Sequence, residues 1–289
     1  MEFFIATLVA GLSIGSIYGF IGLSFTAIFN ASQVINFAQG ELAMLGAFAG
    51  SILLFSGAVP LPLGIVGIVA LPIAVGIGIN FIFSEPLVKH KAPIISPILA
   101  TLGASLILSG SIGAYTDFSF FKTRFIFGID PLDLGFCKLS TQYAAIIISV
   151  TVLGVGYWVL LNKTRIGLAF KAVGIDDDMA SLVGIKLKQV RLYAWCISSF
   201  MSGVAGFLVA PLILPSALMG LPLMVNGFVA AVFGGFGKPG AAILGGVVLG
   251  LLTQFFTGYI SAGFGELLVF FALIVILAFR PQGILGEKE

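Results

Sequence analysis

Long apolar stretches recur along the whole chain and are separated by short polar connections. A membrane-spanning helix needs about 20 predominantly apolar residues, because each residue adds about 1.5 Å to its length. We therefore expect an all-α polytopic membrane protein, formed by a single transmembrane domain over residues 1–289. The pattern predicts seven spanning helices, over residues 3–29, 36–56, 60–83, 94–115, 142–161, 191–214 and 264–279.

The apolar segment between the last two predicted spans, residues 222–258, is interrupted by Gly237-Lys238-Pro239-Gly240. Its first arm, residues 222–237, would be about 24 Å long as a helix, which is shorter than the hydrocarbon core of about 30 Å. Two arrangements fit this pattern: a pair of tight spans, or a re-entrant hairpin. Both leave the predicted sides of the two termini unchanged.

The composition excludes a soluble fold and several classes of site. Of the 289 residues, 59% are hydrophobic and 9% are charged, whereas soluble proteins carry roughly 25% charged residues. The net charge of +2 comes from residues in short loops, so we expect no nucleic-acid partner. The two cysteines and the single histidine have no metal-ligand spacing, and we expect no metal or other cofactor in this chain.

The basic residues predict the orientation in the membrane. With the N-terminus outside, residues 84–93, residues 162–190, Lys238 and the C-terminus all lie inside. Together with Arg191 they hold eleven of the fourteen basic residues. The loop at residues 116–141, which would lie outside, holds the other three. Because cytoplasmic loops are enriched in Lys and Arg, we expect the N-terminus outside and the C-terminus inside.

Three polar residues interrupt the second predicted span: Asn36, Gln39 and Glu41. A charged residue at the centre of a membrane helix costs about 2.5–3.5 kcal/mol on insertion scales. At 100° per residue, Glu41 lies about 140° from Asn36, so the two side chains should meet different neighbours. One interpretation is a capping box with Asn36 as N-cap, and the other is a set of polar groups beside a translocation path.

Small residues recur at helical spacing in two predicted spans. Gly11, Gly15 and Gly19 lie four residues apart near the N-terminus, and Gly246 and Gly250 repeat the spacing later. Such ridges let helix backbones approach closely in membranes, so we expect tight helix packing at both places.

The loop at residues 162–190 contains signals for a short helix. Asp176, Asp177 and Asp178 are typical of a helix start, and Gly184 is typical of a helix end. The alternative is a solvated connector that its charges keep inside. The order of the start and stop signals favours a helix at the membrane surface that docks onto a partner.

Four segments occur in order along the chain: VINFAQGE, TRIGLAFKAVGIDDDMASLVGI, GFVAAVFGGFGKPGAAILGG and FRPQGILG. Together they resemble the permease subunit of bacterial branched-chain amino acid ABC transporters, over essentially the whole chain. The resemblance implies a multi-pass protein of the bacterial inner membrane. It also implies three kinds of partner besides the lipid bilayer: two ABC ATPase subunits that bind ATP, a second permease subunit or a second copy of this chain, and an extracytoplasmic solute-binding protein.

In that family the inside loop corresponds to the coupling helix, which sits in a groove of the ATPase. ABC importers often mark this helix with Glu-Ala-Ala, three residues and Gly. Here Asp178-Met179-Ala180 is followed three residues later by Gly184. The resemblance therefore assigns Asp178, Ala180 and Gly184 to ATPase coupling, although the second position departs and the later Ile-x-Leu-Pro part is missing.

The leading hypothesis is a permease subunit of an ATP-driven importer for a small polar solute, with amino acids first. The chain has no phosphate-binding loop of the Gly-x4-Gly-Lys-Ser/Thr type, so we expect no enzymatic activity in this chain and ATP hydrolysis in a partner. The alternative is a secondary transporter or channel, for which the interrupted arms at residues 222–258 would suit a binding site. Against it, Glu41 and Glu266 are essentially the only ionisable residues in the predicted spans.

Overall fold

The computed structural model describes residues 2–54, 60–90, 92–93, 95–121, 123, 132–133, 138–280 and 283–284. Two π-helical segments extend α-helices, with η1 (Gly50–Leu54) continuing α2 and η2 (Asn80–Ser84) joining α3 to α4. A short antiparallel pair joins β1 (Leu132–Asp133) to β2 (Lys138–Leu139). The α-helices are α1 (Glu2–Ser32), α2 (Gln39–Ala49), α3 (Leu61–Ile79), α4 (Glu85–Lys89), α5 (Ile95–Thr116), α6 (Thr141–Lys163), α7 (Arg165–Ile175), α8 (Asp177–Leu182), α9 (Leu187–Ile213), α10 (Gly220–Gly234), α11 (Pro239–Tyr259) and α12 (Ala262–Phe279).

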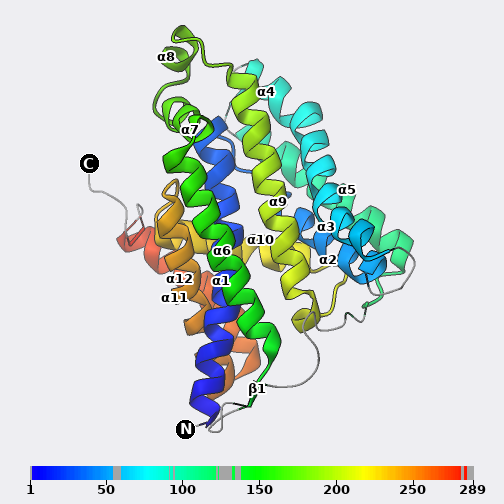
Figure 1. Cartoon of the computed structure of the whole chain (residues 1–289). Helices are drawn as coiled ribbons and strands as arrows, with labels where there is room; N and C mark the ends of the chain where they lie inside the picture. Colours follow the sequence, from blue (N-terminus) through cyan, green and yellow to red (C-terminus); the bar gives the residue numbers. More distant parts are fainter. Residues whose placement is uncertain are drawn as a thin grey trace.

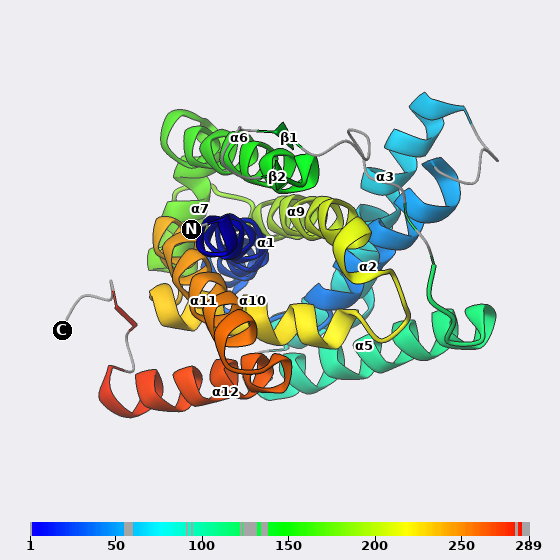
Figure 2. The same cartoon turned by 90° about the horizontal axis from the view of Figure 1, so that it is seen from below.

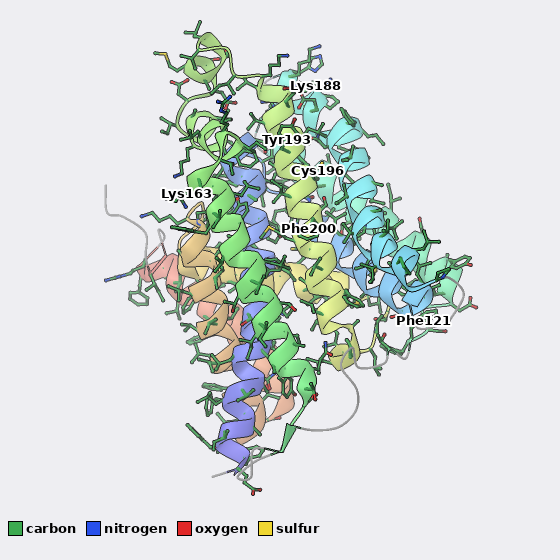
Figure 3. All side chains as sticks on the ribbon, in the orientation of Figure 1. Phe121, Lys163, Lys188, Tyr193, Cys196 and Phe200 are labelled. Carbon is green, nitrogen blue, oxygen red and sulfur yellow. The ribbon has the colours of Figure 1, made fainter. Side chains whose placement is uncertain are left out.

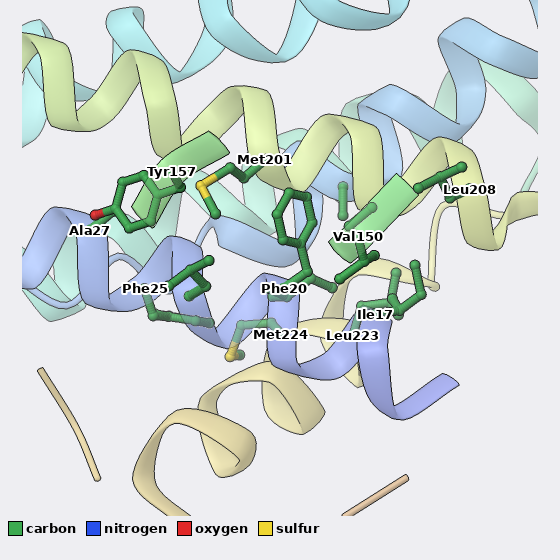
Figure 4. Packing of buried hydrophobic residues seen from close by; sticks show 14 of the residues in the cluster. Ile17, Phe20, Phe25, Ala27, Val150, Tyr157, Met201, Leu208, Leu223 and Met224 are labelled. Atoms are coloured by element: carbon green, nitrogen blue, oxygen red, sulfur yellow. The ribbon is translucent and has the colours of Figure 1, made fainter. Parts of the chain in front are cut away.

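Helix α1 is the centre of the bundle and packs against α9, α10 and α11 (Figures 1 and 2). Its side chains Phe20 and Phe25 belong to one buried apolar cluster with Tyr157 of α6, Met201 of α9 and Met224 of α10, as Figure 4 shows. Large apolar side chains also cover the outside of the bundle. A surface of this kind suits lipid as the surrounding solvent.

The two predicted glycine ridges pack against each other. A Cβ added to Gly15 would lie 2.7 Å from the carbonyl oxygen of Gly246. A Cβ added to Gly250 would in turn collide with the backbone of Gly15, and one added to Gly246 would collide with Gly19. The prediction of close packing is confirmed, because α1 and α11 touch backbone to backbone along these residues.

Six described helical stretches are long and apolar enough to cross a membrane: Glu2–Ser32, Pro62–Lys89, Ile95–Thr116, Thr141–Lys163, Leu187–Ile213 and Pro239–Tyr259. Five of them correspond to predicted spans, and the sixth is α11. The count of seven secure spans is not confirmed, because the helices at residues 36–56 and 264–279 are not among the six. The first of these begins only at Gln39, and all eleven residues of α2 are buried inside the protein.

The interrupted segment at residues 222–258 forms α10, a turn at residues 235–238 and α11. With 15 residues, α10 is about 22 Å long, so its predicted shortness is confirmed. Figure 2 shows α1 end-on and α10 from the side, so α10 lies across the bundle. Of the two arms, only α11 has the length of a membrane span.

The polar connections gather at the two ends of the bundle. Helices α4, α7 and α8 lie at one end, and the N-terminus and β1 lie at the other (Figure 1). The segments at residues 84–93 and 162–190, which the basic residues place on one side of the membrane, therefore share an end of the molecule. That this end faces the cytoplasm stays a prediction.

Candidate functional site

The chain leaves the helical conformation between α1 and α2, at residues 33–38. Backbone N–H groups away from water need an acceptor, and side chains supply it here. The N–H of Phe37 donates to the Thr101 hydroxyl of α5 at 3.1 Å, and the N–H of Ala38 donates to Asn36 Oδ1 at 3.0 Å. Asn36 and Thr101 therefore stabilise the break before α2.

Of the two interpretations of Asn36, the capping box with Asn36 as N-cap is wrong. The N-cap of α2 is Ala38, and it has no side-chain cap. Asn36 lies two residues earlier. Its side-chain oxygen accepts a hydrogen bond from the N–H of Ala38, as Asn side chains do in turns. Its Nδ2 group donates to Gln39 Oε1 at 2.9 Å, so the two predicted residues do touch, through their side chains.

Gln39 joins three helices from a fully buried position. Its Nε2 lies 2.7 Å from Ser24 Oγ of α1 and 2.7 Å from Ser198 Oγ of α9, and it also contacts Ser202 Oγ. Ser198 Oγ donates in turn to the Ser24 carbonyl at 2.8 Å. The two protons of the amide are shared among these hydroxyls, and the cluster ties α2 to α1 and α9.

Glu41 faces the other side of α2, because two residues along a helix correspond to about 200°. A Cβ added to Gly220, the first residue of α10, would lie 2.7 Å from Glu41 Oε1, and Ser105 of α5 lies within hydrogen-bonding reach. Glu41 is 2% exposed, and its Oε2 has no hydrogen-bond partner among the described residues. The prediction that Asn36 and Glu41 meet different neighbours is confirmed.

The contact between α3 and α9 contains further buried polar atoms. On α9, Trp195 Nε1 and Ser199 Oγ have no hydrogen-bond partner within the described part of the chain, and Asn80 Oδ1 of η2 has none either. A Cβ added to Gly76 of α3 would collide with Ser199 Oγ, so the two helices pack closely at that point. A buried polar group without a partner costs about 1–3 kcal/mol, so this contact is less stable than a fully paired or wholly apolar one.

At the end of the bundle, α8 has the predicted start and stop. Asp176 is its N-cap and accepts a hydrogen bond from the Met179 N–H at 2.9 Å. Gly184 has φ +86°, and the N–H groups of Gly184 and Ile185 donate to the carbonyls of Ser181 and Ala180. This pair of bonds is the Schellman motif that ends helices at a glycine.

The ends of α7 and α8 expose large apolar side chains on the segment between α6 and α9. Ile175 is 87% exposed, Leu182 80% and Val183 77%. We call this group, with Met179, the coupling tip. Of the residues that the family resemblance assigns to coupling, Asp178 and Gly184 are exposed beside the tip and Ala180 packs inward.

Arg191, near the start of α9, joins the tip to the membrane helices (its neighbours Lys188 and Tyr193 are labelled in Figure 3). Its Nε lies 3.2 Å from Glu85 Oε2 of α4, and its guanidinium lies 3.7 Å from Asp177 Oδ2 of α8. Burial raises the pKa of the Asp177 carboxyl, while Arg191 opposes that rise. From the sequence, Arg191 is only a basic residue at the predicted start of a span. Its contacts with Glu85 and Asp177 could not be inferred from that position.

Comparison with known proteins agrees with this architecture. The family model described as "Branched-chain amino acid transport system / permease component" matches residues 7–279. The LivH permease proteins of Methanocaldococcus jannaschii and Escherichia coli strain K12 are 28% and 27% identical, over 92% and 99% of this chain and 87% and 97% of their own lengths. The BraD permease protein of Pseudomonas aeruginosa is 28% identical, over 99% of this chain and 97% of its own length.

The solved structure described as PsaBC from Streptococcus pneumoniae in complex with Fab has a similar fold, with a TM-score of 0.52 at 12% identity. The match covers 98% of this chain and 93% of that one. The helical architecture is thus found in a known structure, and the family follows from the sequence comparisons. The chain belongs to the family of branched-chain amino acid transport permeases, and it is a transmembrane permease subunit of an ABC importer.

Proposed function

We propose that this subunit moves branched-chain or other amino acids across the inner membrane, with ATP hydrolysed by partner subunits. The observation that carries the proposal is the full-length similarity to permeases whose names specify branched-chain amino acid transport. The solute-binding protein outside the membrane would select the solute. The permease pair, formed with a homologous subunit or a second copy of this chain, would supply the path.

Glu41 borders the path in this proposal, and Asn36 and Gln39 hold α2 beside it. The support is the difference in hydrogen bonding along α2: the two amides have side-chain partners, whereas one carboxylate oxygen of Glu41 has none in the described structure. A buried carboxylate in a membrane protein is expensive and marks functional positions. An amino acid carries an ammonium group, and this oxygen would accept a hydrogen bond from it when the path opens.

The coupling tip docks onto an ATPase subunit, with Asp178 and Ala180 in the short helix α8 and Gly184 ending it. An exposed apolar group on a polar loop is typical of a protein interface. Arg191 then carries the movement to α9, and through Glu85 to α4 and α3. Since the α3–α9 contact contains unpaired polar atoms, we expect these two helices to separate at low cost.

Uptake by proteoliposomes tests this function. The permease pair is reconstituted with its ATPase subunits and solute-binding protein, and labelled leucine, isoleucine and valine are offered with ATP enclosed on the ATPase side. We expect uptake that requires ATP and all partners. Uptake by the permease alone would instead support a secondary transporter or channel.

Labelling of single cysteines tests the orientation. Ser181→Cys and Thr123→Cys are made separately in a background without Cys137 and Cys196, and cells are treated with an impermeant thiol reagent. We expect Thr123→Cys to react from outside and Ser181→Cys to react only after the cells are opened. Labelling of Ser181→Cys in intact cells would reverse the proposed topology.

A further inference from the structure

A groove runs along the outside of the bundle between α1, α6 and α11, and α7 closes one end. Its volume is about 1040 Å³. The walls are mostly apolar, with Val150 and Gly154 from α6 and Ile243 and Val247 from α11. Because Gly154 has no side chain, the groove stays open where α6 passes Ile243.

The polar residues of the groove gather at its α7 end. Lys171 Nζ donates to Asn162 Oδ1 at 2.8 Å, and the Asn162 amide donates to the Trp158 carbonyl at 2.9 Å. Lys163 and Arg165 follow Asn162 along the chain, at the junction of α6 and α7, and Figure 3 shows Lys163 at the outer side of the bundle. The ion pairs between described residues all involve Arg191, so no described acid neutralises these three cations.

The position of Trp158 relates this end to the membrane surface. The side chain lines the groove one turn before Asn162 and is 57% exposed. Trp is enriched where the hydrocarbon core meets the headgroups, because its ring is apolar and its N–H is polar. The apolar part of the groove therefore faces the acyl chains, and the cationic part lies at headgroup level.

We propose that this groove binds an anionic phospholipid, with an acyl chain along α6 and α11 and the phosphate beside Lys171. On α1 the lining extends from Leu12 to Asn30, which is about 27 Å along the helix. One leaflet contributes only about half of the hydrocarbon core of about 30 Å, so an acyl chain fits. Basic pockets between membrane helices on the cytoplasmic side recognise anionic lipid headgroups, and Lys171, the cation that lines the groove, supplies that charge here.

Fluorescence quenching by brominated lipids measures this binding. The chain has two tryptophans, and Trp195 is fully buried, so the difference between the full chain and its Trp158→Phe variant isolates the groove signal. The full chain is reconstituted in phosphatidylcholine with rising fractions of brominated phosphatidylglycerol or brominated phosphatidylcholine. We expect phosphatidylglycerol to bind about fivefold more tightly than phosphatidylcholine, the effect of about one lysine near the surface.

Three variants separate a groove site from general attraction. Lys171→Gln keeps a partner for Asn162 and removes the charge, so the preference should fall about fivefold. Gly154→Leu fills the apolar part and should also abolish the preference, although every cation remains. Lys188→Gln is the control, since Lys188 lies over Phe81, away from the groove, and it should change nothing.

Equal affinity for the two lipids in the unmodified chain would overturn the proposal, as would a preference that survives Lys171→Gln. A preference that survives Gly154→Leu but needs Lys171 would show attraction of headgroups at the surface without a groove site. Absence of quenching by either lipid would also overturn the proposal, because lipid would then not reach the groove.

Discussion

The start of α2 and the coupling tip both reverse the usual distribution of side chains, in opposite ways. Helix α2 buries Gln39 and Glu41, and the tip exposes Leu182 and Val183. The tip has a simple explanation, because apolar side chains on a polar loop are stabilised when a partner covers them. The two buried residues at the start of α2 need different explanations, because the Gln39 amide is fully paired and the Glu41 carboxylate is not. Burial alone therefore does not separate Gln39 from Glu41, whereas their hydrogen bonds do.

The largest expected effect is from Gln39→Leu, which removes the centre of the paired cluster. The hydroxyls of Ser24, Ser198 and Ser202 would lose their shared donor and Asn36 its acceptor. The hydroxyls keep hydrogen bonds to one another and to the backbone of α1, but Asn36 Nδ2 is left without its acceptor, and a buried polar group left unpaired costs about 1–3 kcal/mol. We expect the amount of assembled complex and its thermal denaturation midpoint to fall clearly.

Gln189→Leu is the matched control for this change, since Gln189 is exposed on α9. Thermal denaturation of the purified complex compares the two variants. Equal midpoints for Gln39→Leu and Gln189→Leu would mean that the cluster does not hold the helices together.

Glu41→Gln should have the next largest effect, and it should act on uptake. The amide keeps the shape and removes the negative charge, and a buried unpaired charge is not needed for stability. If the carboxylate meets the solute, uptake should fall about tenfold, which corresponds to about 1.4 kcal/mol of lost interaction. Assembly and ATPase activity should stay near those of the unmodified complex.

The comparison within α2 would fail if Glu41→Gln transported at the unmodified rate with equal amounts of complex. Glu41 would then belong to the structural class of Gln39. Glu2→Gln serves as control, because Glu2 is exposed at the opposite end from the tip (Figure 1).

At the coupling tip, Gly184→Glu should uncouple ATP hydrolysis from transport. A residue with a Cβ is strained at φ +86° by about 1–2 kcal/mol, and the new charge lies beside the apolar tip. Gly184→Asn is the control, because Asn tolerates this conformation and no atom lies within 4 Å of an added Cβ. The measurement is transported solute per ATP hydrolysed. Normal coupling in Gly184→Glu would remove α8 from the docking surface.

Much of the fold could be predicted because it depends on local patterns. Apolar length identified the long helices, glycine spacing identified the α1–α11 contact, and Asp176 and Gly184 identified the ends of α8. The late start of α2 could not be predicted from hydropathy, because Val34 and Ile35 are apolar in the non-helical stretch as well. The break depends instead on Gln33, with φ +54°, and on side-chain acceptors for the backbone.

The candidate site was only partly predictable. The sequence identifies Asn36, Gln39 and Glu41 as candidates because they are polar residues in an apolar run. Ser198 and Ser202 have helical spacing, but nothing in the sequence distinguishes them from other small residues. Their pairing with Ser24 depends on how α9 packs on α1. Arg191 is separated from Glu85 by more than a hundred residues along the chain, so only the folded structure brings the two charges together.

The smallest expected effect concerns Asp177, whose charge, unlike that of Glu41, is partly solvated. Burial raises the pKa of this carboxyl more than Arg191 lowers it, so the ionised form is disfavoured in the folded protein. The penalty is present above the folded-state pKa and disappears as the pH falls below the ordinary value for Asp. Since the side chain is 40% exposed, solvent screens the effect and keeps it small.

Asp177→Asn should therefore leave α8 slightly more stable at neutral pH, and the difference should vanish in acid. Hydrogen exchange of the α8 amides measures this, with variant and unmodified chain compared at the same pH so that intrinsic rates cancel. Asp178→Asn, at an exposed site of the same helix turn, is the control. Faster exchange in Asp177→Asn at neutral pH would mean that the 3.7 Å contact with Arg191 and the helix N-terminus outweigh burial. The Arg191 contact would then stabilise α8.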